Sequence, residues 1–264
     1  MASGKKLKNF FEYLDEIKGR LNGKTLVVFL DYDGTLTPIV ATPDLAIISD
    51  EMRLTVENLS QKIKVAIVSG RATDDVRSKV KISGIFYAGS HGFEINYPSG
   101  EVKINDEAQQ IRPIIDEIQA KLTERVKHIE GALIENVKYT VSCHYRLVKD
   151  EDFEEFEKEV DSVLLEYPQL RKTSGKKVFE IRPKIDWHKG KAVDWILSIF
   201  EKEQKDILPV YLGDDTTDED AFRALKEKGF GILVATAERE TEAEYIVKNP
   251  QDVKEVLETF IQIT

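Results

Sequence analysis

The chain has 264 residues, of which 41% are hydrophobic, enough for one large domain or two unequal ones. Its net charge of −10 argues against nucleic acid or an anionic membrane as the main partner, and no apolar run is long enough to span a membrane. The single cysteine, Cys143, excludes an internal disulfide, and the four histidines show no metal-binding spacing. We expect a cytoplasmic protein, and the sequence leaves its oligomeric state open, a monomer included.

Short apolar runs that end in glycine or acidic residues recur along the chain and predict buried parallel strands. They lie at 25–34, 65–71, 84–92, 209–215 and 230–234. Helical patterns at 49–61, 72–80 and 188–203 separate them. This alternation predicts an α/β fold with a doubly wound parallel sheet.

The stretch from 98 to 183 follows a different pattern. Helical spacing at 105–128 and 150–167 alternates with strand-like segments at 132–136, 139–146, 169–175 and 176–183. The order αββαββ predicts a small α+β domain inserted into the larger one. We predict a core of 1–97 and 184–264 with an inserted domain at 98–183.

Five polar residues follow the ends of predicted strands, namely Asp31, Asp33, Ser69, Asp214 and Asp215. In open α/β sheets, ligands bind beyond the carboxyl ends of the strands, so these side chains are expected in one crevice. A DxD pair alone also occurs in ordinary loops. The four motifs DxDGT, SGR, KG and GDDxTDE, in this order on alternating strands and helices, are far more specific. They lie at four separate strand or helix ends, and all four indicate the same site.

The paired aspartates suit phosphoryl transfer. Asp31 is placed to attack a phosphoryl group, and Asp33 to protonate the leaving oxygen and later to activate water. Such chemistry needs a divalent cation, and carboxylate oxygens suit Mg²⁺. We expect Asp214 to bind the cation with Asp31 and the backbone carbonyl of Asp33, while Asp215 or Asp218 holds its waters.

Phosphate oxygens also need hydrogen-bond donors and a fixed positive charge. The Ser69 hydroxyl, the Gly70 N–H and the Lys189 ammonium at a helix start are candidates. Gly34 and Thr35 form a turn whose N–H groups can face the anion.

In the inserted domain, alternation places Thr140, Ser142, His144 and Arg146 on one face of a strand, and Glu180 and Arg182 on one face of another. A polar sheet face of this kind suits a sugar with many hydroxyl groups. A solvated outer face remains the alternative for His144 and Arg146.

These motifs resemble a known family. DYDGT, VSGR, HKG and GDDTTDED look like the four motifs of the haloacid dehalogenase superfamily, with the insert where its type C2 caps lie. DYDGTLTPI, GSHGFE, VFEIRP, DWHKGKAV and LGDDTTDEDAF are similar to trehalose-6-phosphate phosphatases. The resemblance implies Asp31 as nucleophile, Asp33 as acid/base, Ser69 and Lys189 on phosphate, and Asp214 on Mg²⁺ with Asp218 in support. It also implicates Glu180, with Glu94 as a second sugar contact. Arg71 of VSGR is a further candidate for substrate contact.

The expected function is Mg²⁺-dependent hydrolysis of trehalose 6-phosphate through an aspartyl phosphate. A phosphatase for sucrose 6-phosphate or a mannosyl phosphate compound is the alternative within the same class, and a phosphomutase is a weaker one. A catalytically silent sugar-phosphate-binding subunit is the alternative from another class.

Overall fold

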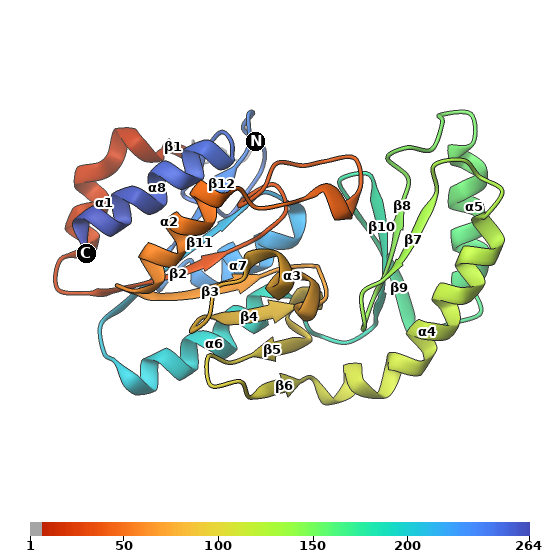
Figure 1. Cartoon of the computed structure of the whole chain (residues 1–264), viewed down its shortest axis with the longest axis horizontal. Coiled ribbons are helices and arrows are strands. Elements are labelled where there is room, and N and C mark those ends of the chain that lie inside the picture. The colour runs from red at the N-terminus through yellow and green to blue at the C-terminus, as the bar shows by residue number, and fades with distance from the viewer. Residues whose placement is uncertain (1–6) are drawn as a thin grey trace, which may run out of the picture.

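The computed structural model describes residues 7–264, and its largest element is a nine-stranded sheet (Figure 1). The strands, in pairing order, are β1 Lys8–Asn9, β13 Tyr245–Val247, β12 Phe230–Val234, β11 Ile207–Gly213, β2 Thr25–Leu30, β3 Lys64–Val68, β4 Phe86–Gly89, β5 Glu94–Asn96 and β6 Val102–Ile104. Neighbours from β1 to β4 run parallel, whereas β4, β5 and β6 pair antiparallel. The predicted doubly wound sheet is confirmed. The first six residues of the predicted core lie outside the described range.

Helices cover both faces of this sheet because its central strands are apolar on both sides. Leu26, Val28 and Leu30 of β2 face one hydrophobic cluster, and Val27 and Phe29 face another. The first cluster is covered by α1 Leu14–Leu21, α2 Asp50–Ser60, α3 Thr73–Val80 and α8 Pro250–Ile263. The second is covered by α6 Lys189–Glu203 and α7 Glu219–Leu225. All three helices predicted from the pattern are present.

The inserted domain, hereafter the cap, has the predicted αββαββ order. It contains α4 Asp106–Val126, β7 Leu133–Asn136, β8 Val141–His144, α5 Phe153–Leu164, β9 Leu170–Gly175 and β10 Val178–Pro183. The strands pair antiparallel in the order β7-β8-β10-β9. Val141, Cys143, Phe179 and Ile181 pack against the two helices in one buried cluster. The opposite, more polar face of the cap sheet turns toward the core.

The border between core and cap differs from the expectation. The predicted boundary at 97/98 falls inside the hairpin between β5 and β6, and β6 pairs with β5 in the core sheet. These strands are too short to give an alternation signal. We therefore propose that the cap comprises residues 105–183.

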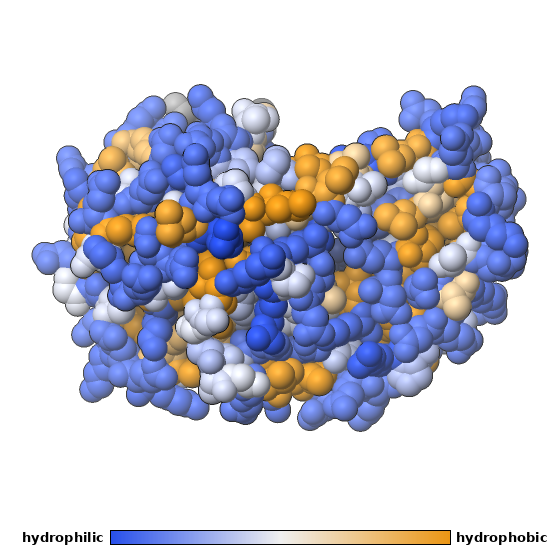
Figure 2. Space-filling model, in the orientation of Figure 1, coloured by the Kyte–Doolittle hydropathy of each residue, from blue (hydrophilic) through white to orange (hydrophobic). Residues whose placement is uncertain are grey.

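The junction is held by a small apolar cluster of Phe93, Ala108 and Tyr139. Hydrophilic residues cover most of the face shown in Figure 2, and hydrophobic residues form separate patches over both the core and the cap. Of the helices described between residues 7 and 264, none is long and apolar enough to cross a membrane.

Candidate active site

The loop after β2 brings Asp31 to the centre of the carboxyl edge of the sheet. Its N–H donates to the Leu212 carbonyl at 3.0 Å, so the neighbouring strand β11 fixes the backbone at this position. Gly34 follows with φ +83°, and a Cβ there would lie 2.1 Å from Oδ2 of Asp214. Only glycine lets the loop adopt this φ and pass so close to Asp214 without strain.

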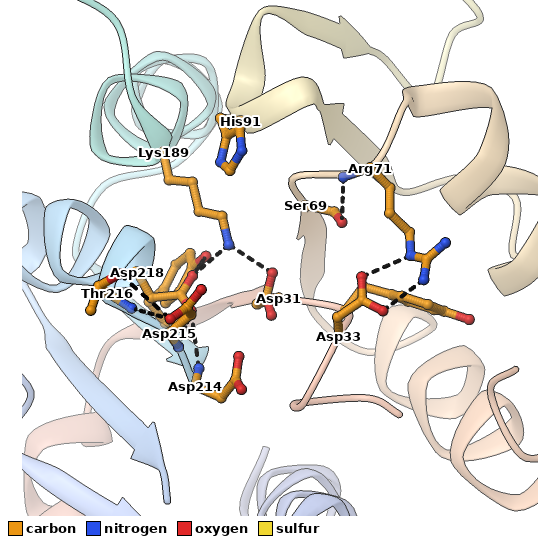
Figure 3. A network of polar contacts seen from close by, with 12 residues as sticks. Asp31, Asp33, Ser69, Arg71, His91, Lys189, Asp214, Asp215, Thr216 and Asp218 are labelled. Atoms are coloured by element: carbon orange, nitrogen blue, oxygen red, sulfur yellow. Dashed lines mark hydrogen bonds and ion pairs between the residues drawn. The ribbon is translucent and has the colours of Figure 1, made fainter. Parts of the chain in front are cut away.

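Lys189, at the first residue of α6, lies between two carboxylates. Its Nζ is 2.7 Å from Oδ1 of Asp31 and 2.7 Å from Oδ1 of Asp218, and all three side chains are buried (Figure 3). Burial lowers the pKa of Lys189, but Asp218 and Asp31 outweigh it and raise that pKa well above its usual value. Burial, together with the charges of Asp218 and Asp214, raises the pKa of Asp31 well above its usual value, and Lys189 offsets this increase only in part. The ammonium is therefore the group that favours a charged Asp31.

Asp218 is held by four donors. Its Oδ1 accepts from Lys189 and from the Tyr211 hydroxyl at 2.6 Å, while its Oδ2 accepts from the N–H groups of Asp214 and Asp215 at 3.0 and 2.9 Å. Burial alone would raise the pKa of Asp218, but Lys189 and these donors lower it. With both oxygens in use, Asp218 is better suited to shaping the loop than to direct cation binding.

Asp214 offers the freer carboxylate. Burial, assisted by the charge of Asp218, raises its pKa to about 7, although Lys176 opposes the shift. Lys176 belongs to the turn between β9 and β10 of the cap, and its Nζ forms an ion pair with Oδ2 of Asp214. Asp215, next in the chain, caps a short helical turn through Thr216 N–H at 2.8 Å.

Carboxylate oxygens of Asp31, Asp214 and Asp218 all lie within 4.8 Å of one another. These are hard oxygen donors, and burial and mutual repulsion raise the pKa values of Asp31 and Asp214, so a further positive charge is needed for all three carboxylates to be ionised together. This donor set fits Mg²⁺. Asp31 and Asp214 are the residues that would hold the cation directly, with Asp218 supporting the loop.

Asp33 lies apart from this group. Arg71 Nε and Nη2 donate to its two carboxylate oxygens at 2.7 and 2.8 Å, and Figure 3 shows Asp33 turned toward Arg71. Arg71 is fixed in turn by Asp75 and the Pro43 carbonyl, each at 2.8 Å. A bidentate pair of this kind sets the orientation of the Asp33 carboxylate.

A cavity between core and cap brings many of the predicted residues together. Its lining includes the predicted Asp31, Asp33, Gly70, Arg71, His144, Arg146, Glu180, Lys189, Asp214 and Asp215. Ser142, also on the predicted polar face, lines it as well. The polar face of the cap sheet is therefore turned toward the loops that carry Asp31 and Asp214 and is not an outer face.

Glu180 and His144 have specific partners in this cavity. Glu180 of β10 pairs with His91 of the core, with Nε2 3.0 Å from Oε1. Burial lowers the pKa of His91, which favours the neutral ring as a donor to Glu180. Burial of Glu180 opposes its ionisation, but His91, Arg182 and Lys189 outweigh that and lower its pKa to about 2. On β8, Nε2 of His144 lies 3.0 Å from Oε2 of Glu135.

Other predicted residues lie outside the cavity lining. Ser69 is fully buried and accepts from the Arg71 N–H, Thr35 is fully buried, and Gly34 packs against Asp214. Glu94 is buried and binds Lys138 Nζ at 3.1 Å, so it joins β5 to the cap. Arg182 is buried beside a neighbouring cavity that Arg171 also lines.

Some site residues were not found from the sequence. They are Tyr211, Glu135, Lys176 and the segment 39–43, which contribute a hydroxyl, a carboxylate, an ammonium and an apolar wall. The alternation of residues along 209–215 and 132–136 could have assigned Tyr211 and Glu135 to one face of their strands. It could not have shown which residues they contact. Lys176 gave one signal, its place in the turn between two predicted strands.

Comparison with known proteins identifies the family of this chain. The sequence model of the trehalose-phosphatase family matches residues 29–251. The chain belongs to this family. "Probable trehalose-phosphate phosphatase D" of Arabidopsis thaliana is 46% identical over 259 residues, which cover 94% of this chain and 70% of that protein.

Two solved structures have a similar fold. The C-terminal domain of Candida albicans trehalose-6-phosphate phosphatase has a TM-score of 0.81 at 24% identity, covering 99% of this chain and all of that one. A haloacid dehalogenase-like hydrolase from Bacteroides thetaiotaomicron has a TM-score of 0.60 at 16% identity, covering 90% and 99%. At these identities the likeness concerns the fold alone. The resemblance drawn from the sequence motifs is confirmed at the family level.

Proposed function

We propose that this protein hydrolyses trehalose 6-phosphate to trehalose and phosphate, that Mg²⁺ is its cofactor, and that Asp31 carries the phosphoryl group. The observation that supports this most is the arrangement around Lys189. A buried nucleophile must be charged to attack, and the Lys189 ammonium at 2.7 Å favours the charged form of Asp31. The choice of trehalose as the sugar rests on the names of the relatives.

The reaction takes two steps. In the first, an oxygen of Asp31 bonds to phosphorus, the bond between phosphorus and the sugar oxygen breaks, and Asp33 gives that oxygen a proton. In the second, Asp33 takes a proton from water, whose oxygen bonds to phosphorus and releases Asp31 and phosphate. A bound Mg²⁺ would neutralise charge on the phosphoryl oxygens.

Asp33 has to leave its present partner to do this. Arg71 binds both of its oxygens, so the side chain must rotate toward the leaving oxygen once substrate is seated. We infer that Arg71 keeps Asp33 away from Asp31 beforehand, which limits repulsion between the two carboxylates.

Sugar recognition is assigned to the cap face. Glu180, His144 and Arg146 line the cavity opposite the catalytic loops, and their polar groups suit sugar hydroxyls. Contacts made there, remote from the phosphoryl group, would help to align that group against Asp31.

The test is phosphate release from a panel of trehalose 6-phosphate, sucrose 6-phosphate and a mannosyl phosphate compound. We expect the highest kcat/KM for trehalose 6-phosphate, loss of activity with EDTA and recovery with Mg²⁺. Asp31→Asn, which keeps the shape of the side chain, is the control and is expected to be inactive. Equal rates across the panel would contradict the assigned substrate.

A further inference from the structure

The tip of the cap hairpin between β9 and β10 lies on the candidate cation site. Lys176 Nζ donates to the Asp214 backbone carbonyl at 3.0 Å and forms an ion pair with the Asp214 carboxylate. The neighbouring Gly175 is also close to the core, since a Cβ there would lie 3.3 Å from Oδ2 of Asp215. A cap residue thus binds the carboxylate that is best placed for a cation.

The Asp214 carboxylate that Lys176 contacts lies among other acidic groups. Its carboxylate is 4% exposed and lies near Asp215 and Asp218, which are also acidic. Within residues 7–264, Lys176 is the cation that contacts it, because Lys189 binds Asp31 and Asp218 instead. The Lys176 side chain is 46% exposed, so the ammonium can move into solvent at small cost.

We propose that Lys176 competes with the divalent cation for Asp214, so that cation binding releases the cap hairpin from the core. An ammonium and Mg²⁺ both need the Asp214 oxygen, and their like charges repel at contact distance. Once displaced, Lys176 remains on the cavity rim, where the phosphoryl group of a substrate would enter. The proposal rests on the magnesium site of the proposed function and adds a positioning role for a cap residue.

Lys177 offers a matched control. It follows Lys176 in the same turn, carries the same charge, and places its Nζ 5.8 Å from the centre of the Tyr145 ring. In the described part of the chain it forms no hydrogen bond or ion pair with Asp214, and it does not line the cavity. Lys177→Met therefore removes one positive charge from the hairpin and leaves the Asp214 contact in place.

The experiment measures cation binding without substrate, by the electron paramagnetic resonance signal of free Mn²⁺, which takes similar oxygen ligands to Mg²⁺. We expect Lys176→Met to bind Mn²⁺ about tenfold more tightly than the unmodified protein, because its competitor is gone. Lys177→Met should bind like the unmodified protein. Equal or weaker binding by Lys176→Met, or equal tightening in both variants, overturns the proposal.

Backbone hydrogen exchange gives a second readout that a purely structural ion pair would not produce. In the unmodified protein, exchange at residues 174–178 should accelerate on addition of Mg²⁺, whereas in Lys176→Met it should already be fast and insensitive to the cation. A hairpin that becomes more protected with Mg²⁺ contradicts release. If none of the three proteins binds a divalent cation, the magnesium site of the proposed function fails, and the Lys176 proposal with it. If all three proteins bind the cation with equal affinity, only the Lys176 proposal fails.

Discussion

Arg71 binds both carboxylate oxygens of Asp33, at 2.7 and 2.8 Å, and so separates that residue from Asp31, two positions earlier. The two aspartates therefore have different partners, because Asp31 pairs with Lys189. One motif thus supplies two carboxylates whose surroundings suit different roles.

Arg71→Gln tests this division. Without the guanidinium, nothing holds Asp33 away from Asp31, and repulsion between the two carboxylates disfavours the charged nucleophile, so we expect kcat to fall about tenfold or more. Asp75→Asn is the control, because Asp75 also binds Arg71 but does not line the cavity. Steady-state kinetics on trehalose 6-phosphate measures both. An unchanged kcat in Arg71→Gln would remove the positioning role.

Gly34→Ala tests the close approach between the loop after β2 and Asp214. The new Cβ would lie 2.1 Å from Oδ2 of Asp214, so that carboxylate must move. We expect a marked increase in the Mg²⁺ concentration needed for half-maximal activity. Gly84→Ala is matched to it, because Gly84 has a similar φ of +79° and nothing within 4 Å of its Cβ position. The control should cost about 1 kcal/mol of stability and leave the Mg²⁺ requirement unchanged. Similar requirements in both variants would contradict Asp214 as a ligand.

The motifs predicted the position of this site because strand ends are set by local pattern. The runs 25–34 and 209–215 each end at the carboxyl edge of the sheet, and parallel neighbours bring Asp31 and Asp214 together. Alternation likewise placed Ser142 and His144 on one face of a strand and Glu180 on one face of another, and these residues line the cavity. Both predictions depend on periodicity, which sequence shows directly.

The side-chain pairings could not be predicted in the same way. Arg71 and Asp33 are 38 residues apart, and Lys176 and Asp214 are also 38 apart, so their contacts depend on how loops and domains pack. Glu94 lies in β5, a strand of three residues whose register shows only when it pairs with β4. That pairing places Glu94 at the junction with Lys138 and outside the cavity.

Stability should depend on pH through Glu180. Its pKa falls from 4.5 in the unfolded chain to about 2 in the fold. The unfolded state therefore binds the proton more readily, so charged Glu180 stabilises the fold above pH 4.5, and this contribution is lost as pH falls from 4.5 toward 2. The shift corresponds to about 3 kcal/mol. Urea unfolding should show a larger deficit for Glu180→Gln at pH 6 than at pH 3. A deficit that is the same at both pH values would contradict this linkage.

Sugar recognition by the cap predicts selective loss in Glu180→Ala. We expect kcat/KM for trehalose 6-phosphate to fall tenfold or more, about 1.4 kcal/mol for each tenfold step, because contacts remote from the phosphoryl group are lost. Hydrolysis of a small aryl phosphate, which cannot reach the cap face, should stay nearly unchanged. Comparable losses on both substrates would mean that Glu180 supports the catalytic loops through His91 instead.

The most direct test of the proposed mechanism is to quench the protein in acid during turnover of trehalose 6-phosphate with Mg²⁺ and to locate any bound phosphoryl group by peptide mass spectrometry. Asp33→Asn should be quenched alongside, with an aryl phosphate whose leaving group needs no proton, because loss of the base for the second step lets the phosphoenzyme accumulate. We predict a phosphoryl group on Asp31 in both cases and none in Asp31→Asn. A phosphoryl group on another residue, or continued turnover by Asp31→Asn, would contradict Asp31 as the nucleophile.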